Sequence, residues 1–249
     1  MAGNKEIEGM KMQTEDFFRA PVWYPILSEH TFTTYFVRLS PQETEALANG
    51  VTKGEIPAGV VKRLRYPMEA TPGNCFIITD RCAPTDTERF LYKHGAVYSP
   101  ESAWKILASS AKIRSAAKAG EVEYIGVRPY RRMNRTREFR LFVRNGAPVG
   151  MSQYNLARHF RRLAGIRDEL LAKTLKWFAA IRPEIPLSDY TLDLYFISIG
   201  QILLIDFNPW GPPTSPLLYN RWERDWSSGP ELKLMPEPVK LSGSVNVSF

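Results

Sequence analysis

Two aspartates and an asparagine occupy one short stretch of this chain, and their spacing points most directly to chemistry. The stretch 191–209, TLDLYFISIGQILLIDFNP, consists of two apolar, β-branched runs on either side of Ile199-Gly200. A hairpin that uses those two residues as its loop places Asp193 directly opposite Asp206, with Cβ atoms about 5 Å apart. Alternation along the second strand then puts Asn208 on the same face as Asp206.

Oxygen atoms gathered in this way are typical of a magnesium site. Two carboxylates this close repel each other unless a cation lies between them. Mg²⁺ prefers oxygen ligands and keeps water or substrate phosphates in its remaining positions. We therefore predict that Asp193, Asp206 and Asn208 bind Mg²⁺. The alternative is an exposed hairpin face with solvated acids, and a bulge or a three-residue loop would shift the register. Bulky apolar neighbours argue against that alternative: Phe207, Pro209 and Trp210.

The composition limits what kind of protein can carry this hairpin. The chain has 249 residues, 44% of them hydrophobic and 24% charged, which suits one large globular domain or two small ones packed together. No apolar run approaches the ~18 residues of a membrane span, and the polar N-terminus is unlike a secretory signal.

The two cysteines, Cys75 and Cys82, fit a reducing cytoplasm and have no zinc-ligand spacing with the three histidines. The net charge of +7 favours an anionic partner: nucleotide phosphates, nucleic acid or an acidic protein surface.

Strands and helices are mixed without a regular βαβ alternation, so the sequence predicts an α+β fold. A capping box at Ser40 predicts a helix start, and Ser99-Pro100 predicts a second one. The other expected elements are extended segments at 23–27 and 32–39, a loop over 55–73, and a strand at 75–79. The helix from Ser99 should run to about residue 120. Further along, we expect strands at 122–128, 138–145 and 148–153, a helix over 156–181 that is broken at Gly165, and an extended tail from Ser227.

Several short motifs, taken in order, resemble the cell division cycle protein 123 family. They are WYP, DRCAPTD, SS within a predicted helix, VRPY followed by EFRLFV, GMSQ, LDLYF, LIDFNPWG and LLYNRW, and they extend from Trp23 to Trp222. Each motif is weak alone, but their order and the spacing from Arg128 to Arg140 make the resemblance specific. That family has an ATP-grasp fold, in which two α+β lobes hold ATP and magnesium in the cleft between them. The resemblance implies an N-terminal lobe over 1–120, a C-terminal lobe with the metal-binding hairpin over 121–226, and a tail over 227–249.

The resemblance also assigns roles to individual residues. It implies that Asp193, Asp206 and Asn208 hold magnesium against the phosphates of ATP. Arg140, in the EFR motif, would contact phosphate oxygens, for which a guanidinium provides paired donors. The remaining implied nucleotide-binding residues are Ala83, Asp86, Arg128 and Tyr130.

Two positions depart from the pattern of the family. Ile78 and Ala108 align with family lysines that are expected near the nucleotide. Arg81, Lys105 and Lys112 are the candidate substitutes. If none of them substitutes, the pocket has less positive charge and binds nucleotide more weakly.

The implied function is that of a cytoplasmic ATP- and magnesium-binding protein that acts on a protein partner. In a eukaryotic host, that partner would be translation initiation factor two, which family members assemble. One alternative is an ATP-dependent ligase that activates a carboxylate as an acyl phosphate for attack by an amine, with catalytic residues unassigned. Another is a scaffold that keeps the fold without nucleotide.

The segment 128–140 is strongly basic and has three interpretations. Its six arginines are Arg128, Arg131, Arg132, Arg135, Arg137 and Arg140. The segment could be a solvated loop, a clamp for phosphate or substrate, or an RNA-binding surface. The RNA interpretation is poorly supported, because Tyr130 is the only aromatic residue on which a base could stack.

Overall fold

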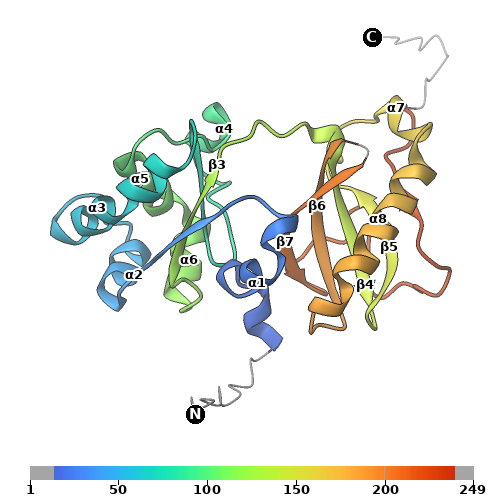
Figure 1. Ribbon diagram of the computed structural model, residues 1–249, viewed down its shortest axis with the longest axis horizontal. Coiled ribbons are helices and arrows are strands. Elements are labelled where there is room, and N and C mark those ends of the chain that lie inside the picture. Colours follow the sequence, from blue (N-terminus) through green and yellow to red (C-terminus); the bar gives the residue numbers. More distant parts are fainter. Residues whose placement is uncertain (1–13, 199, 239–249) are drawn as a thin grey trace, which may run out of the picture.

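The computed structural model describes residues 14–198 and 200–238 and has two β-sheets, one in each of two lobes (Figure 1). In the first lobe, β1 (Tyr35–Arg38), β3 (Tyr124–Pro129) and β2 (Cys75–Thr79) form an antiparallel sheet in that spatial order. The five-stranded sheet of the second lobe has the order β7-β6-β4-β5-β8. Its strands are β4 (Glu138–Arg144), β5 (Ala147–Gln153), β6 (Tyr190–Ser198), β7 (Gln201–Pro209) and β8 (Leu232–Lys233). The predicted α+β class with two lobes is confirmed.

Helices surround the sheet of the first lobe and share its core. They are α2 (Pro41–Ala48), α3 (Glu55–Ala70), α4 (Glu88–Lys93), α5 (Pro100–Ser109) and α6 (Ala111–Lys118). The predicted helix starts are confirmed, because Ser40 and Ser99 each form a capping box ahead of a proline. The helix predicted from Ser99 to about residue 120 is in fact two helices. Ser110 ends α5 with extended backbone angles, and its hydroxyl then caps α6.

Two predictions of local structure were wrong: prolines and glycines indicated a loop in the first segment, and aromatic and β-branched residues indicated an extended chain in the second. The segment predicted as a loop over 55–73 is mostly α3, which buries Val60, Leu64 and Met68 at helical spacing. The segment predicted to be extended at 23–27 belongs to α1 (Ala20–Leu27), which buries Trp23 and Leu27 one turn apart. In both helices the burial of one apolar stripe outweighs the hydrogen bond that an internal proline removes.

In the second lobe, α8 (Arg167–Ile181) packs against one face of the sheet. Its buried residues Leu170 and Phe178 share a core with Leu141 and Leu192 of the central strands. The helix predicted over 156–181 begins only at Arg161, and it is broken near Gly165, as expected, into α7 (Arg161–Ala164) and α8. The predicted Asn145-Gly146 hairpin turn is confirmed by the positive φ angles of both residues, 52° and 73°.

The sheets divide the chain differently from the predicted lobe boundaries. Strand β3 follows residue 120, yet it pairs within the first sheet. Strand β8 falls within the predicted tail, yet it pairs with β5 in parallel. The compact part therefore continues beyond Trp226, and residues 239–249 of the predicted tail lie outside the described residues.

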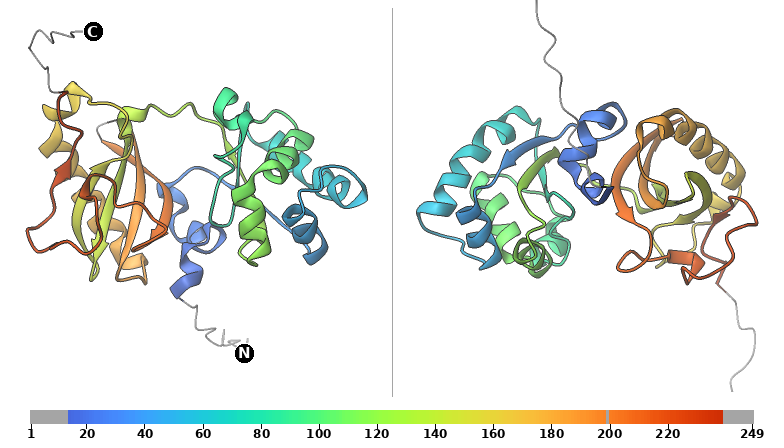
Figure 2. Two further views of the ribbon diagram at one scale, coloured as in Figure 1. Left: turned by 180° about the vertical axis from the view of Figure 1, so that it is seen from behind. Right: turned by 90° about the horizontal axis from the view of Figure 1, so that it is seen from below.

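The segment 14–34 lies between the lobes and contacts both of them (Figures 1 and 2). It contains η1 (Thr14–Phe18), α1 and η2 (Ser28–His30). Phe17 and Trp23 pack on the ring of Phe207 in β7, with centroids 5.3 and 5.6 Å apart. No helix in the described part of the chain is long and apolar enough to cross a membrane.

Candidate functional site at the junction of the lobes

Two irregularities in the pairing of β6 with β7 cancel, so the two aspartates are opposed as predicted. Ser198 pairs with Gln201 next to the turn, the following pairs are shifted by one residue, and the register returns where Asp193 meets Asp206. Ile199, half of the predicted loop, lies outside the described residues. The predicted cross-strand pair is confirmed, although the path to it contains two bulges.

The second irregularity also decides which face of the sheet carries the polar groups. Leu204 and Phe207 both lie in the apolar core beneath the sheet, although they are three residues apart. A bulge inverts the alternation of side chains between them. Asp206 and Asn208 therefore lie on the face opposite to that core, together with Asp193.

Arg140 of β4 provides the positive charge beside Asp193. The two residues are cross-strand neighbours, and Nε and Nη2 of Arg140 donate to the two carboxylate oxygens of Asp193 at 2.7 and 2.8 Å. Nη1 of Arg140 donates to the carbonyl oxygen of Ser215 at 2.8 Å, and Nδ2 of Asn208 donates to Oδ2 of Asp193 at 3.1 Å. Arg140 and Asp193 are 5% and 7% exposed, so they form a buried, bidentate ion pair.

Arg128 extends from β3 of the first lobe to the backbone of β7 in the second. Its Nε donates to Oγ1 of Thr34 at 3.0 Å and its Nη1 to the carbonyl oxygen of Ile205 at 3.3 Å. The guanidinium lies over the ring of Trp23, 5.9 Å from its centre. Its Nη2 is buried and has no hydrogen-bond partner within the described residues. An unpaired donor of this kind is costly unless a ligand engages it.

Asp206 is the least satisfied acid of the group. Its hydrogen bond within the described residues comes from the adjacent N–H of Phe207, at 3.0 Å. Burial, followed by the charge of Asp193, raises the pKa of Asp206 to about 7, and the guanidinium of Arg128 offsets this only in part. Burial in turn lowers the pKa of Arg128 to about 10. Arg128 is 5% exposed and Asp206 is partly buried, so water solvates both charges only in part.

Lys112 and Cys82 complete the site from the first lobe. Lys112 is an exposed residue in the first turn of α6, and its charge lowers the pKa of Asp206. Burial raises the pKa of the Cys82 thiol. The charge of Lys112 lowers that pKa, and the charge of Asp206 raises it further. The three side chains therefore lie near one another where the lobes meet.

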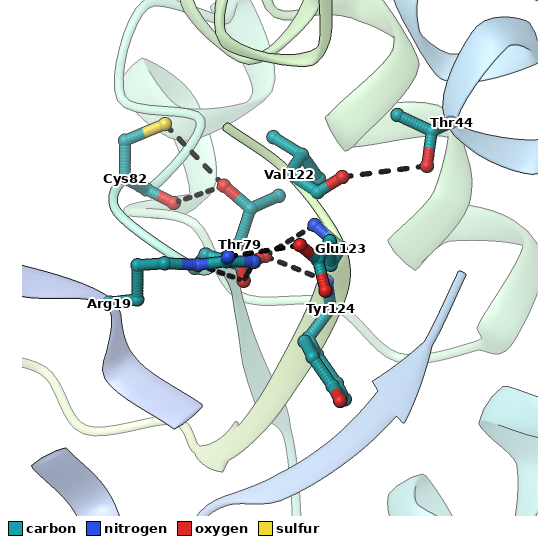
Figure 3. A network of polar contacts seen from close by, with 8 residues as sticks. Arg19, Thr44, Thr79, Cys82, Val122, Glu123 and Tyr124 are labelled. Carbon is teal, nitrogen blue, oxygen red and sulfur yellow. Dashed lines mark hydrogen bonds and ion pairs between the residues drawn. The ribbon is translucent and has the colours of Figure 1, made fainter. Parts of the chain in front are cut away.

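A buried carboxylate holds the turn that carries Cys82. Asp80, whose side chain is 0% exposed, accepts the backbone N–H groups of Glu123 and Tyr124 at 2.8 and 2.7 Å and both Nε and Nη2 of Arg19. Figure 3 shows Arg19 from the segment before α1 reaching Glu123 at the start of β3. Beside them, the hydroxyl of Thr79 donates to the carbonyl oxygen of Cys82 at 3.1 Å (Figure 3). The network joins the interlobe segment to the β2 turn and to β3.

The remaining predicted nucleotide-binding residues make no direct hydrogen bond to the two aspartates of the hairpin among the described contacts. Asp86 accepts the N–H of Lys112 at 3.0 Å and the hydroxyl proton of Ser110, so it holds the N-terminus of α6. Ala83 is partly buried and packs against the core of the second lobe. The N–H of Tyr130 donates to Asn74 O at 2.7 Å. The binding roles implied for these residues stay predictions.

Both positions at which the family lysines are absent lie in apolar packing. Ile78 is 7% exposed, and its side chain packs over Gly126 of β3. It also belongs to the apolar core of the second lobe. Ala108 is 2% exposed within the core of the first lobe. The charge of Lys112, one of the substitutes proposed from the sequence, lowers the pKa of Asp206.

Sequence reasoning missed two further groups on this face. Burial and the charge of Asp193 raise the pKa of Glu138 to about 7, while Arg135 lowers it. Thr191 is fully buried opposite Asn208, and its hydroxyl has no partner within the described residues. Period-two alternation from Arg140 and from Asp193 would have indicated both residues.

The donor set fits a magnesium ion that arrives with phosphates better than it fits the bare ion. The part of the chain that the structure describes contains no group of three or more His, Cys, Asp or Glu able to hold a metal. Asp206 has oxygen lone pairs to spare, and the amide oxygen of Asn208 is free of the bond that its nitrogen makes to Asp193. The two aspartates are balanced by Arg128 and Arg140, so the site offers a bare cation little net attraction.

Comparison with known proteins assigns the family. The D123 family model matches residues 105–237, which is more than half of the chain and includes β3 to β8. The chain belongs to the D123 family. This confirms the resemblance found in the motifs, because cell division cycle protein 123 relatives are among the similar proteins.

Two curated relatives of the D123 family illustrate the match. A CDC123-like protein of Acanthamoeba polyphaga mimivirus is 25% identical over 87% of this chain and 74% of its own length. A translation initiation factor eIF2 assembly protein of Xenopus laevis is 36% identical over 34% of this chain. That second match spans only a quarter of the Xenopus protein.

The solved structure of C-terminally truncated Cdc123 from Schizosaccharomyces pombe has the same fold. It matches with a TM-score of 0.74 over 92% of this chain and all of that chain. Sequence identity is 17%, so the likeness concerns the fold alone. The arrangement of two lobes described above is therefore that of Cdc123.

Proposed function

We propose that this D123 protein binds a nucleoside triphosphate, ATP in the first instance, together with Mg²⁺ at the junction of its lobes. The observation that carries the proposal is the pair of Asp206 and Arg128, an under-solvated carboxylate beside a buried guanidinium with an unused donor. A phosphate oxygen would accept from Nη2 of Arg128. A cation held by Asp206 and by the amide oxygen of Asn208 would relieve the repulsion between Asp206 and Asp193.

The ion pair of Arg140 with Asp193 gives each residue a role in such a site. Arg140 fixes the rotamer of Asp193 and still has N–H donors for a phosphate oxygen. Asp193 has second lone pairs on its oxygens that a metal-bound water or the metal itself could use. Mg²⁺, when bound, would neutralise phosphate charge, whereas the orientation of the phosphates would come from the two arginines.

Isothermal titration tests the proposal. We expect a nonhydrolysable ATP analogue to bind with Mg²⁺ present and more weakly with EDTA present. Mg²⁺ alone should give no measurable heat, because the site has no net charge to attract it. Absence of binding at millimolar analogue, with Mg²⁺ present, would leave the nucleotide-free scaffold as the better interpretation.

The lysine of α6 provides a prediction with a matched control. Lys112→Ala should weaken binding of the triphosphate about fivefold to tenfold, because the charge of Lys112 acts on Asp206 and would pair with phosphate. Lys105→Ala removes the same charge from an exposed position on α5 and should leave affinity unchanged. The same titration measures both variants. Equal losses would mean that only the overall charge of the lobe matters.

We further propose that the nucleotide serves an action on a protein partner, as an assembly factor for a translation initiation factor of the eIF2 type. The support is membership of the D123 family together with the name of the Xenopus relative, an eIF2 assembly protein. Size-exclusion chromatography with purified eIF2 subunits, with and without Mg²⁺ and nucleotide, tests this. Release of ADP on addition of amino acids or peptides, which supply both a carboxylate and an amine, with no complex formed, would favour the ligase alternative.

A further inference from the structure

The linker between the two sheets presents a concentrated positive charge. It runs from Tyr130 to Arg137, leads from β3 to β4, and crosses from one lobe to the other at the top of Figure 1. Its four arginines are all exposed: Arg131, Arg132, Arg135 and Arg137. None of the salt bridges among the described residues involves any of them. The charge of Arg135 acts on Glu138 at the start of β4, whose pKa it lowers.

The linker is anchored at both ends. In the first lobe, the N–H of Tyr130 donates to Asn74 O at 2.7 Å. In the second lobe, the N–H of Asn134 donates to the hydroxyl of Tyr195 at 3.3 Å, and Nη1 of Arg137 donates to the carbonyl oxygen of Ile197.

A local turn then fixes the middle of the linker. The side-chain oxygen of Asn134 accepts from both the backbone N–H and the hydroxyl of Thr136, at 3.0 and 2.9 Å. This interaction caps η3 (Arg135–Arg137). The bonds of Tyr130 and Asn134 hold the backbone on both sides of Arg131 and Arg132, one end on each lobe.

We propose that this linker is a docking surface for an acidic segment of a protein partner. Guanidinium groups pair with carboxylates through two parallel hydrogen bonds, and a row of them fits a run of glutamates or aspartates. A partner of that kind would also relieve the mutual repulsion of four like charges. A nucleic acid fits less well, because the single aromatic residue of the linker, Tyr130, is partly buried and leaves the bases nothing on which to stack.

The proposal deepens the partner side of the proposed function and does not depend on nucleotide binding. Arg128 and Arg140 of the candidate site flank the linker in sequence, so a docked segment would lie beside the junction of the lobes. The arginines that bind the segment are nevertheless separate from the residues assigned to nucleotide. The two functions can therefore fail separately in an experiment.

The test uses a fluorescein-labelled oligoglutamate peptide of about ten residues, which spans the linker when extended. Fluorescence anisotropy with the full chain should show binding that weakens as salt is raised. Arg131→Ala combined with Arg132→Ala should weaken binding about tenfold. The control, Lys62→Ala combined with Arg65→Ala, removes the same charge from exposed positions on α3 at the outer edge of the first lobe (Figure 1) and should change it less than twofold.

Three outcomes would overturn the proposal. They are no binding of the peptide by the parent protein, equal losses in the two double variants, and tighter binding of a single-stranded oligonucleotide of matched charge that depends on the same two arginines. Titration of the ATP analogue into the linker variant should be unchanged, which confirms that it is folded. If the analogue does not bind the parent protein but the peptide result holds, the nucleotide proposal fails and the docking surface stands.

Discussion

Replacing Asp206 with asparagine should abolish magnesium-dependent nucleotide binding and at the same time stabilise the unliganded protein. Binding should be lost because the amide carries no charge to hold the cation against the phosphates. Stability should rise because the carboxylate is under-solvated and lies opposite Asp193, which together raise its pKa to about 7. A charged group that destabilises the unliganded protein but is needed to bind the ligand is typical of a functional site.

The pH dependence of the Asp206 effect follows from the direction of the shift. The pKa is higher in the folded protein than its usual value of 3.8, so the folded state holds this proton more tightly than the unfolded state. Below about pH 4 both states are protonated and Asp206 costs nothing. The penalty then grows as pH rises and is complete above about pH 7, with an upper limit of about 4 kcal/mol. Asp206→Asn should therefore gain roughly 1–3 kcal/mol at pH 8 and nothing below about pH 4.

Asp193→Asn is the matched control, because it makes the same chemical change on the opposite strand. It should also abolish binding, yet it should destabilise the protein by about 3–5 kcal/mol, since Arg140 is 5% exposed and would lose its bidentate partner. Urea denaturation at pH 5 and pH 8, together with calorimetric titration of the ATP analogue, measures both effects. Unchanged analogue affinity in Asp206→Asn would refute the metal site, and a loss of stability in that variant would refute the under-solvated carboxylate.

The part of the site that the sequence predicted is the part that depends on local pattern. Two β-branched runs around a short turn are enough to oppose Asp193 and Asp206, since a hairpin pairs neighbouring segments. The prediction succeeded although the hairpin contains two bulges, because one adds a residue to β6 and the other adds one to β7. No feature of the sequence marks either bulge, so an odd number of them would have put the acids out of register.

The groups that balance these acids come from distant parts of the chain and could not be predicted in the same way. Arg140 meets Asp193 only because β4 lies between β5 and β6 in the sheet. Arg128 reaches β7 only because the segment 14–34 holds the lobes together. From the sequence we proposed that magnesium offsets the repulsion between the aspartates. In the structure, the guanidinium groups of Arg128 and Arg140 offset much of that repulsion.

Helix α3 shows the opposite error, in which a local signal was given too much weight. Its prolines and glycine indicated a loop, but Val60, Leu64 and Met68 form an apolar stripe that the core of the first lobe buries. Local propensity is worth about 3 kcal/mol for a proline in a helix interior. Burial of three large side chains contributes more than that. The apolar period would have been the better guide.

Removing the carboxylate of Asp80 should destabilise the protein by about 3–5 kcal/mol, the largest loss we expect from a single residue away from the hairpin. Asp80→Ala leaves the N–H groups of Glu123 and Tyr124 without an acceptor and leaves the guanidinium of Arg19 without its main partner. Asp80→Asn keeps an oxygen for the two N–H groups but loses the charge, so its loss should be smaller. Arg63→Ala, which breaks an ion pair with Glu43 in which Arg63 is 43% exposed, should cost under about 1 kcal/mol.

Loss of the Asp80 network should also weaken nucleotide binding, although Asp80 itself is not expected to touch the nucleotide. Arg19 fixes the start of α1, and α1 places Trp23 over the guanidinium of Arg128 and against Phe207, the neighbour of Asp206. A loosened α1 would let Arg128 leave the junction, so Asp80→Asn should bind the ATP analogue more weakly at temperatures where it is still folded. In the double variant Asp80→Asn with Arg19→Gln, a neutral hydrogen bond replaces the lost ion pair. If the double variant binds the analogue more tightly than Asp80→Asn alone, Asp80 has a positioning role. A folded Asp80→Asn protein with the parent's affinity for the analogue would show instead that the network serves stability alone, and that the junction keeps its geometry without α1.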